Sequence, residues 1–270
     1  MMRTMRRTLG IAAGVLTQVL FVATVWRLAP FLWEIPPSNA GSLWIDLLLA
    51  AQFNVVHSFL LYPAVRDRVE RIVPTAFYSC FFCVVTCLGL LLLMSCWRSN
   101  PMVLWQFTRA GRVGMAIACG VAWMGLFYSL YLAGLGYQTG LKPWWYWVRG
   151  RKPPRRSFQP RGAFRLLRHP VYASFLALIW CTPTVTLDRG LLIAICTGYV
   201  YVGSCLKDRR LLFYMGAAYR QYQARVPGYP GMPFGPLARV VWQEERAELP
   251  VASANASLAV SQPEPAAAVL

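Results

Sequence analysis

Long apolar runs that carry almost no charge divide this chain and limit what it can fold into. A helix needs about 20 apolar residues to cross the hydrocarbon core of a membrane. The runs are Leu9–Trp26, Leu43–Leu61, Ala76–Trp97, Val113–Gly136, Tyr172–Thr186 and Gly190–Leu206. The sequence therefore predicts an all-α fold, a polytopic membrane helical bundle of five to six transmembrane helices.

The composition points to the same class of protein. Hydrophobic residues make up 57% of the chain and charged residues 14%, against about 45–50% and about 25% in soluble domains. The net charge of +17 comes from basic residues that lie between the apolar runs, as anchoring to anionic lipid headgroups requires. We therefore expect contact with membrane lipids and no binding to nucleic acid. The eight cysteines lie in or beside apolar runs, where Cys packs as a small hydrophobe, and no metal site is predicted.

The distribution of Lys and Arg predicts the orientation in the membrane. With the N-terminus inside and six spans, 22 of the 27 basic residues fall on the inner side and five on the outer side. Cytoplasmic segments of membrane proteins are enriched in Lys and Arg. Both termini are therefore predicted to be cytoplasmic, and the excess of Arg over Lys, 24 to 3, favours a bacterial inner membrane.

The first apolar run follows an arginine-rich N-terminus, as in a secretory signal peptide. The run is longer than the apolar core of about 7–15 residues in such peptides, and no clear cleavage site follows it. We expect it to stay in place as the first transmembrane helix, with removal as the alternative.

Four regions are predicted along the chain. Residues 1–42 hold the N-terminal basic segment, the first transmembrane helix and an outer loop, and residues 43–136 hold helices two to four. Residues 137–246 hold a long basic, Trp-rich loop, a helical hairpin and a C-terminal interfacial segment, and this region contains the candidate site residues. Residues 247–270, rich in Ala, Pro and Ser, are predicted to be a disordered tail.

The last two apolar runs are predicted to form a kinked helical hairpin. Pro183 lies inside the first run, and Leu187–Gly190 reads as a tight polar turn between the two. Residues 207–225 are predicted to form an interfacial amphipathic helix. Its apolar face carries Leu211, Met215, Ala218, Tyr219 and Tyr222, while Arg209, Arg220 and Gln223 point away.

Sequence signatures of soluble enzymes are absent from the chain. It has no Gly-rich dinucleotide loop, P-loop, zinc-binding HExxH motif or nucleophile elbow. His57 and Ser58 end the second apolar run without an acidic residue beside them. We therefore interpret His57 as a hydrogen-bonded histidine at a helix end.

Polar residues gather at both ends of the predicted hairpin. Residues 168–172 read Arg-His-Pro-Val-Tyr, and Pro170 suits the first position of a helix, which places His169 at or beside the N-cap. Free backbone N–H groups there, beside Arg168, favour an anionic group. Residues 207–209 return to the same side of the membrane. The two clusters are predicted to meet around a cytoplasm-facing pocket; the alternative is a set of snorkelling and helix-end residues.

The order of these motifs resembles a known family. The chain combines RHPxY at 168–172, the hairpin, KDRRL at 207–211 and YRxYxxRVP at 219–227. Together they resemble the membrane methyltransferases of the isoprenylcysteine carboxyl methyltransferase type. Residues 52–58 and 179–186 resemble in particular the bacterial methanethiol S-methyltransferases. The resemblance covers roughly residues 45–230.

The resemblance implies a cofactor and a set of site residues. The implied cofactor is S-adenosyl-L-methionine, bound on the cytoplasmic side between the last two spans and the C-terminal segment. The implied cofactor-binding residues are Arg168, His169, Pro170, Tyr172, Asp208, Arg209, Tyr219 and Arg225. Arg220 and Tyr222 would help to fix a C-terminal lid. His169 and Arg209 are the implied catalytic residues.

The implied reaction is a direct methyl transfer from the sulfonium to a small thiol such as methanethiol, giving a thioether. Such a transfer needs mainly alignment of the reacting atoms and exclusion of water. Two alternatives stay open: a lipid or prenylcysteine acceptor, and a non-catalytic membrane scaffold that retains the fold.

Two positions depart from the family pattern. Where the family usually has two adjacent glutamates, this chain has Lys207 and Asp208, and Ser174 replaces a small glycine. An ammonium about 4 Å from the sulfonium would repel it by about 4 kcal/mol at an effective dielectric constant of ~20, and Ser174 would crowd a close cofactor. Lys207 therefore points to the lipid headgroups, or the substrate differs, or the catalyst is impaired.

Overall fold

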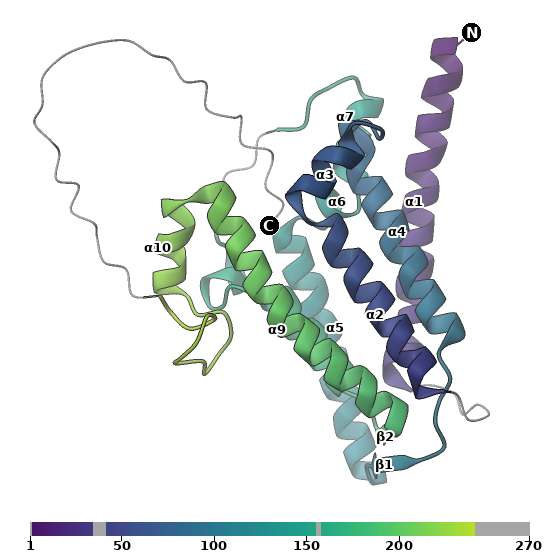
Figure 1. Ribbon diagram of the computed structural model, residues 1–270, viewed down its shortest axis with the longest axis vertical. Helices are drawn as coiled ribbons and strands as arrows, with labels where there is room; N and C mark the ends of the chain where they lie inside the picture. Colours follow the sequence, from purple (N-terminus) through teal and green to yellow (C-terminus); the bar gives the residue numbers. More distant parts are fainter. Residues whose placement is uncertain (1, 35–41, 155–157, 241–270) are drawn as a thin grey trace, which may run out of the picture.

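The computed structural model describes residues 2–34, 42–154 and 158–240. Five of its helices are long and apolar enough to cross a membrane. They are α1 (Met2–Trp33), α2 (Leu43–Leu60), α4 (Thr75–Cys96), α5 (Arg109–Ala133) and α9 (Leu187–Met215). A sixth apolar helix, α8 (Pro170–Trp180), is only about 16 Å long at about 1.5 Å per residue. The predicted all-α membrane bundle is confirmed (Figure 1).

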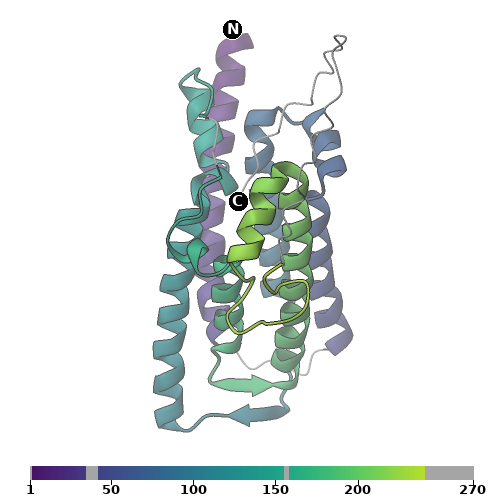
Figure 2. The same cartoon turned by 90° about the vertical axis from the view of Figure 1, so that its left-hand side faces the viewer.

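Short elements lie at the ends of the long helices. They are α3 (Pro63–Glu70), α6 (Leu135–Gln138), α7 (Leu141–Val148), the 3-10 helix η1 (Gly162–Arg165) and α10 (Ala217–Arg225). An antiparallel ribbon of β1 (Val103–Gln106) and β2 (Thr184–Thr186) pairs Val103 with Thr186. Figures 1 and 2 show this ribbon at the end of the bundle opposite to α3, α7 and the start of α1. The long loop predicted after residue 136 therefore contains two short helices and a 3-10 turn.

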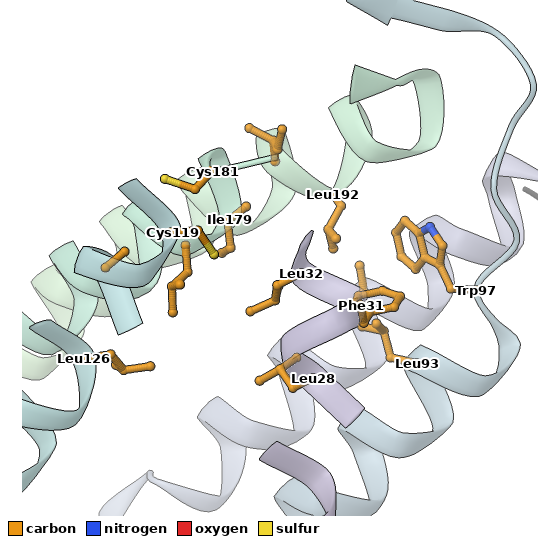
Figure 3. Close-up of a cluster of buried hydrophobic side chains, with 14 residues drawn as sticks. Leu28, Phe31, Leu32, Leu93, Trp97, Cys119, Leu126, Ile179, Cys181 and Leu192 are labelled. Carbon is orange, nitrogen blue, oxygen red and sulfur yellow. The ribbon is translucent and has the colours of Figure 1, made fainter. Parts of the chain in front are cut away.

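The long helices pack in a chain of neighbours. Helix α4 packs between α1 and α2, α2 packs on α9, α9 on α8, and α8 on α5. A core of buried apolar side chains joins them near the ribbon, and it includes Phe31 and Leu32 of α1, Trp97 after α4, and Ile179 of α8 (Figure 3). The first apolar run is therefore an integral part of the bundle.

The outward faces of these helices are strongly apolar. Trp26 of α1 is 81% exposed and Tyr131 of α5 is 78% exposed. Contiguous exposed apolar surface of this kind indicates contact with lipid. Five cysteines are buried in the interior, and they are Cys80, Cys83, Cys87, Cys119 and Cys181.

The prediction for the connection between the last two apolar runs is wrong in detail. Helix α8 ends at Trp180, so Pro183 follows the helix, and Leu187–Gly190 is the first turn of α9. Asp188 accepts hydrogen bonds from the Trp97 indole (2.9 Å) and the Asn100 backbone N–H (2.7 Å). The charged residues of the expected exposed turn are therefore buried and hydrogen-bonded to distant segments.

The helix predicted over residues 207–225 is also divided differently. Residues 207–215 continue α9 because Leu211 is buried against α10, and the chain then turns at Gly216, whose φ of 53° favours glycine. Helix α10 is the separate C-terminal helix. Gln223, expected to point away, is buried.

Candidate functional site

The start of α8 is tied to the C-terminal segment of the chain. Pro170 occupies the first position of the helix and His169 is its N-cap residue, as predicted. The backbone N–H groups of Arg168 and His169 donate to the carbonyls of Pro227 (2.9 Å) and Gly228 (3.3 Å). Both side chains are buried. The motif before α8 therefore lies inside the protein, under the segment that follows α10.

Asp208 of α9 joins three elements. Its Oδ2 atom lies 2.9 Å from Nη2 of Arg168, and its Oδ1 atom lies 3.1 Å from Nε2 of His169. The hydroxyl of Tyr219 in α10 also donates to Oδ1. The structure thus brings together the two polar clusters that the sequence places about 40 residues apart.

Arg168 serves mainly to hold the end of α10. Its Nη1 atom donates to the carbonyls of Gln223 (3.3 Å), Val226 (3.0 Å) and Ala238 (3.2 Å). The side chain is fully buried. With Nη1 on these carbonyls and Nη2 beside Asp208, Arg168 positions the C-terminal segment, while its buried Nε atom has no hydrogen-bond partner within the described residues.

His169 is the buried group best placed to meet a ligand. Burial lowers the pKa of its imidazole, and Asp208 offsets this shift only in part. Nε2 lies 3.1 Å from Oδ1 of Asp208, so a neutral ring that carries its proton on Nε2 would point that proton toward the carboxylate and leave the Nδ1 lone pair as an acceptor. Nδ1 is buried and has no hydrogen-bond partner among the described residues. A ligand that donates an N–H group would satisfy it.

Two tyrosine rings flank His169. The ring of Tyr172 stacks at 5.6 Å with an interplanar angle of 10°, and that of Tyr229 lies at 5.7 Å. The Tyr229 hydroxyl lies 2.6 Å from Oγ of Ser204, and burial raises the pKa of Tyr229 to about 12, so it stays protonated. Sequence reasoning missed Tyr229 and Ser204. An aromatic residue inside the Pro/Gly segment of residues 226–237 is the signal that could have found Tyr229.

The C-terminal helix is fixed through its tyrosines. Tyr219 and Tyr222 pack edge-on against Phe158, and the Tyr222 hydroxyl donates to the Phe164 carbonyl. Burial raises the pKa of both tyrosines, so both hydroxyls remain donors. The C-terminal segment is therefore held on the bundle through the protein's own side chains.

Lys207 lies inside the protein. Its side chain is buried, and its Nζ atom lies 5.2 Å from the centre of the Tyr172 ring. This placement rules out the interpretation that Lys207 points to the lipid headgroups. Arg210, on the same face of α9, is half-buried and donates to the Leu61 carbonyl at 3.3 Å.

Some of the expected site residues stand apart from this cluster. Arg209, Arg220 and Arg225 are exposed. Ser174, expected near the cofactor, lies against α5, where a Cβ atom on Gly125 would come within 3.1 Å of its hydroxyl. Because Tyr172 and Ser174 lie on nearly opposite sides of α8, the serine faces away from Lys207.

His57 is a hydrogen-bonded histidine near the end of α2, as predicted. Its Nδ1 atom lies 3.4 Å from the Thr86 hydroxyl, and its ring packs against Phe53 and Phe82. It lines a narrow crevice between α2 and α4. The adjacent Ser58 hydroxyl lies 3.0 Å from that of Tyr199 in α9. His57 thus belongs to the packing of α2 on its neighbours.

The fold and this geometry define a class: a polytopic helical membrane protein with a buried polar site where its last long helix meets the C-terminal segment. Comparison with known proteins then identifies the family. Residues 46–230 match the family described as NnrU protein, and the chain belongs to that family.

Several relatives are named as enzymes. Methanethiol S-methyltransferase 2 of Bradyrhizobium diazoefficiens is 29% identical over 195 residues, covering 71% of this chain and 74% of the relative. Methanethiol S-methyltransferase of Mycobacterium tuberculosis is 28% identical over 183 residues, covering 67% and 75%. Nurim of Rattus norvegicus is 30% identical over 195 residues, covering 69% and 74%. No solved structure resembles the chain. The similarity supports a membrane methyltransferase.

Proposed function

We propose that this protein is an S-adenosylmethionine-dependent membrane methyltransferase that methylates a small thiol such as methanethiol, giving a thioether. The observation that carries the proposal is the junction of residues 168–172 with Asp208 and α10 in one buried site. These are segments through which the sequence resembles the membrane methyltransferases of the isoprenylcysteine carboxyl methyltransferase type. The names of the bacterial relatives agree with this acceptor.

The side chains at the junction fit S-adenosylmethionine. The unpartnered Nδ1 of His169 can accept a hydrogen bond from an amino group of the cofactor. The rings of Tyr172 and Tyr229 offer aromatic faces, which attract cations such as a sulfonium and stack with a base. When bound, the cofactor supplies a methyl group activated on a positively charged sulfur. His169, Tyr172 and Tyr229 would hold it.

The chain's own residues contribute positioning and exclusion of water. Asp208 fixes the His169 ring, and Arg168 and Tyr219 fix Asp208. The segment after α10 covers the site, because its carbonyls accept hydrogen bonds from Arg168. A methyl transfer depends on alignment in a dry site, so a rigid, covered junction suits this reaction.

We place the site on the cytoplasmic side of a bacterial inner membrane, with both termini cytoplasmic. The end of the bundle that carries α3, α7 and the start of α1 is also the end toward which α9 runs before α10 (Figure 1). Of the 27 basic residues, 22 belong to segments that this orientation puts in the cytoplasm.

The proposal is tested with the full chain purified in detergent. Calorimetry measures S-adenosylmethionine binding, and headspace analysis measures dimethyl sulfide formed from methanethiol. We expect the wild type to bind and to react, and His169→Ala to lose at least about 100-fold in rate while still inserting into membranes. Arg209→Ala, measured beside it, tests the catalytic role that the resemblance implies for this exposed arginine. A wild type that binds no cofactor would support the alternative that the protein is a non-catalytic membrane scaffold. Methyl transfer only to prenylcysteine or lipid would show that the acceptor is not a small thiol.

A further inference from the structure

Lys207 is a buried lysine without a carboxylate of its own. It forms no ion pair with any acidic side chain in the part of the chain that the structure describes. The adjacent Asp208 lies beside Arg168 and His169 and accepts from Tyr219. Lys207 contacts instead the ring of Tyr172, with Nζ 5.2 Å from the ring centre.

A second cation lies on the same face of α9. Arg210 follows Lys207 by three residues, so the two side chains are neighbours on the helix. The one hydrogen bond of Arg210 within the described residues is to the neutral Leu61 carbonyl. The region between α2, α8 and α9 therefore carries basic groups with no acid committed to them.

An ammonium buried without an anion is costly. Two arrangements avoid this cost: Lys207 gives up its proton, or a ligand brings an anion. A thiol acceptor fits both arrangements in turn. Lys207 is neutral before the thiol reacts, and once Lys207 has taken the thiol's proton, the thiolate is the anion beside it. A neutral amine also removes the repulsion that a charged Lys207 would exert on a sulfonium.

We propose that Lys207 is the base that ionises the thiol acceptor, and that Lys207 and Arg210 then hold the thiolate opposite the cofactor. This inference rests on the proposed function. Tyr172 contacts both His169 and Lys207, so it lies between the cofactor side and the acceptor side of one site.

The proposed step is balanced in protons and electrons. The S–H bond of the thiol breaks and its proton passes to Nζ of Lys207. The thiolate sulfur forms a bond to the methyl carbon, while the bond between that carbon and the donor sulfur breaks, with its electron pair left on the donor sulfur. The thioether leaves uncharged, and Lys207 releases the proton to water.

The test compares two acceptors of the same shape in the purified full chain. Methanethiol must lose a proton before it reacts, whereas methaneselenol is more acidic and is largely ionised at neutral pH. We expect Lys207→Met to lower kcat for methanethiol by about 10²-fold or more, the range for loss of a general base. The same variant should lower kcat for methaneselenol much less. Lys207→Arg keeps a cation but cannot take a proton, and it should show the same selectivity between acceptors.

Cofactor binding provides the readout that separates catalysis from folding. Calorimetry should give Lys207→Met a Kd for S-adenosylmethionine no weaker than that of the wild type, because a base on the acceptor side does not hold the cofactor. Lys207→Arg, which always carries its charge, should bind the cofactor more weakly. Lys142→Met is the matched control. Lys142 Nζ also lies over a tyrosine ring, Tyr137 at 5.1 Å, but the lysine is exposed on α7. This control should react like the wild type.

The outcomes distinguish this inference from the proposed function. Equal losses with both acceptors, or full activity of Lys207→Met with methanethiol, would overturn the role of Lys207 and leave the methyltransferase intact. A wild type that transfers methyl to neither acceptor and binds no cofactor would overturn both. Selective loss with methanethiol supports the inference.

Discussion

Helix α9 carries two buried aspartates with different surroundings. Near its start, Asp188 accepts from the Trp97 indole and from the Asn100 backbone N–H, so each oxygen has its own neutral donor. Near its end, Asp208 lies beside Arg168 and His169 and accepts from Tyr219. The first aspartate has hydrogen-bond donors that do not titrate in the physiological range, and the second has a histidine.

The residues next to the two aspartates differ as well. Next to Asp188, the Arg189 guanidinium donates to the carbonyls of Phe31 and Leu32, so that end of α9 is tied to α1. At Asp208, the neighbouring His169 keeps a buried nitrogen without a partner in the described part of the chain. An unpartnered buried nitrogen is present at both ends of α9, since Nε of Arg189 also lacks a hydrogen-bond partner within the described residues. What distinguishes the Asp208 end is a titratable imidazole beside the carboxylate.

Removing Asp208 should have a larger effect than changing Asp188. Asp208→Ala leaves the Arg168 guanidinium buried without its anion, and breaking a buried pair in this way costs about 3–5 kcal/mol. We expect a lower free energy of unfolding by this amount and loss of cofactor binding, because His169 also loses its fixed orientation. Thermal and denaturant unfolding in detergent, with calorimetry, provide the measurement. A loss below about 1 kcal/mol would mean that the pair is solvated.

Asp188 should affect the stability of the fold and not the activity. Asp188→Asn keeps one acceptor oxygen but turns an NH₂ group toward the second donor, at a cost of about 1–3 kcal/mol. Asp188 and Asp208 are separated by about 30 Å along α9 at about 1.5 Å per residue, so we expect methyl transfer per folded molecule to stay within about twofold. A large fall in kcat with unchanged folding would contradict the division of roles between the two aspartates.

The surroundings of Asp208 could be predicted from the sequence more fully than those of Asp188. Pro170 at a helix start and a charged cluster after the next apolar run placed residues 168–172 near Asp208, because antiparallel helices bring their far ends together. The partners of Asp188 could not be found this way. Trp97 and Asn100 lie about 90 residues earlier in the chain, and a short Asp-Arg-Gly sequence between apolar runs has the local pattern of a turn.

The directions of the side chains along α9 could not be predicted from the sequence either. Neighbouring residues on a helix point about 100° apart, so a motif with consecutive charges does not tell which of them face inward. The structure buries Lys207 and Asp208 and exposes Arg209. The resemblance implied Arg209, while Arg210, the next residue, is half-buried and donates to the Leu61 carbonyl. The break at Gly216, which sets where α10 begins, depends on a backbone φ that composition does not reveal.

Acidification should lower the free energy of unfolding through His169, the neighbour of Asp208, and this is the smallest of the expected effects. Burial holds the pKa of His169 in the folded protein below its ordinary value of about 6.5. Below that pH the unfolded chain binds a proton that the folded chain refuses, so the free energy of unfolding should fall as the pH drops, by at most about 1.4 kcal/mol per pH unit. Above pH 7.5 the pH dependence that comes from His169 should vanish, because the imidazole is neutral in both the folded and the unfolded chain.

Unfolding midpoints in detergent between pH 8 and 5.5, for the wild type and His169→Gln, measure this slope. The variant cannot titrate at this position, so its midpoint should fall less steeply. His57→Gln, at the other histidine of the chain, should retain the part of the slope that belongs to His169. Equal slopes for the wild type and His169→Gln would mean that the pKa of His169 does not change on folding. A wild type whose midpoint falls less steeply than that of the variant would mean that His169 is charged in the folded protein. In that case Nδ1 would carry a proton, and it would meet an acceptor on the cofactor instead of a donor.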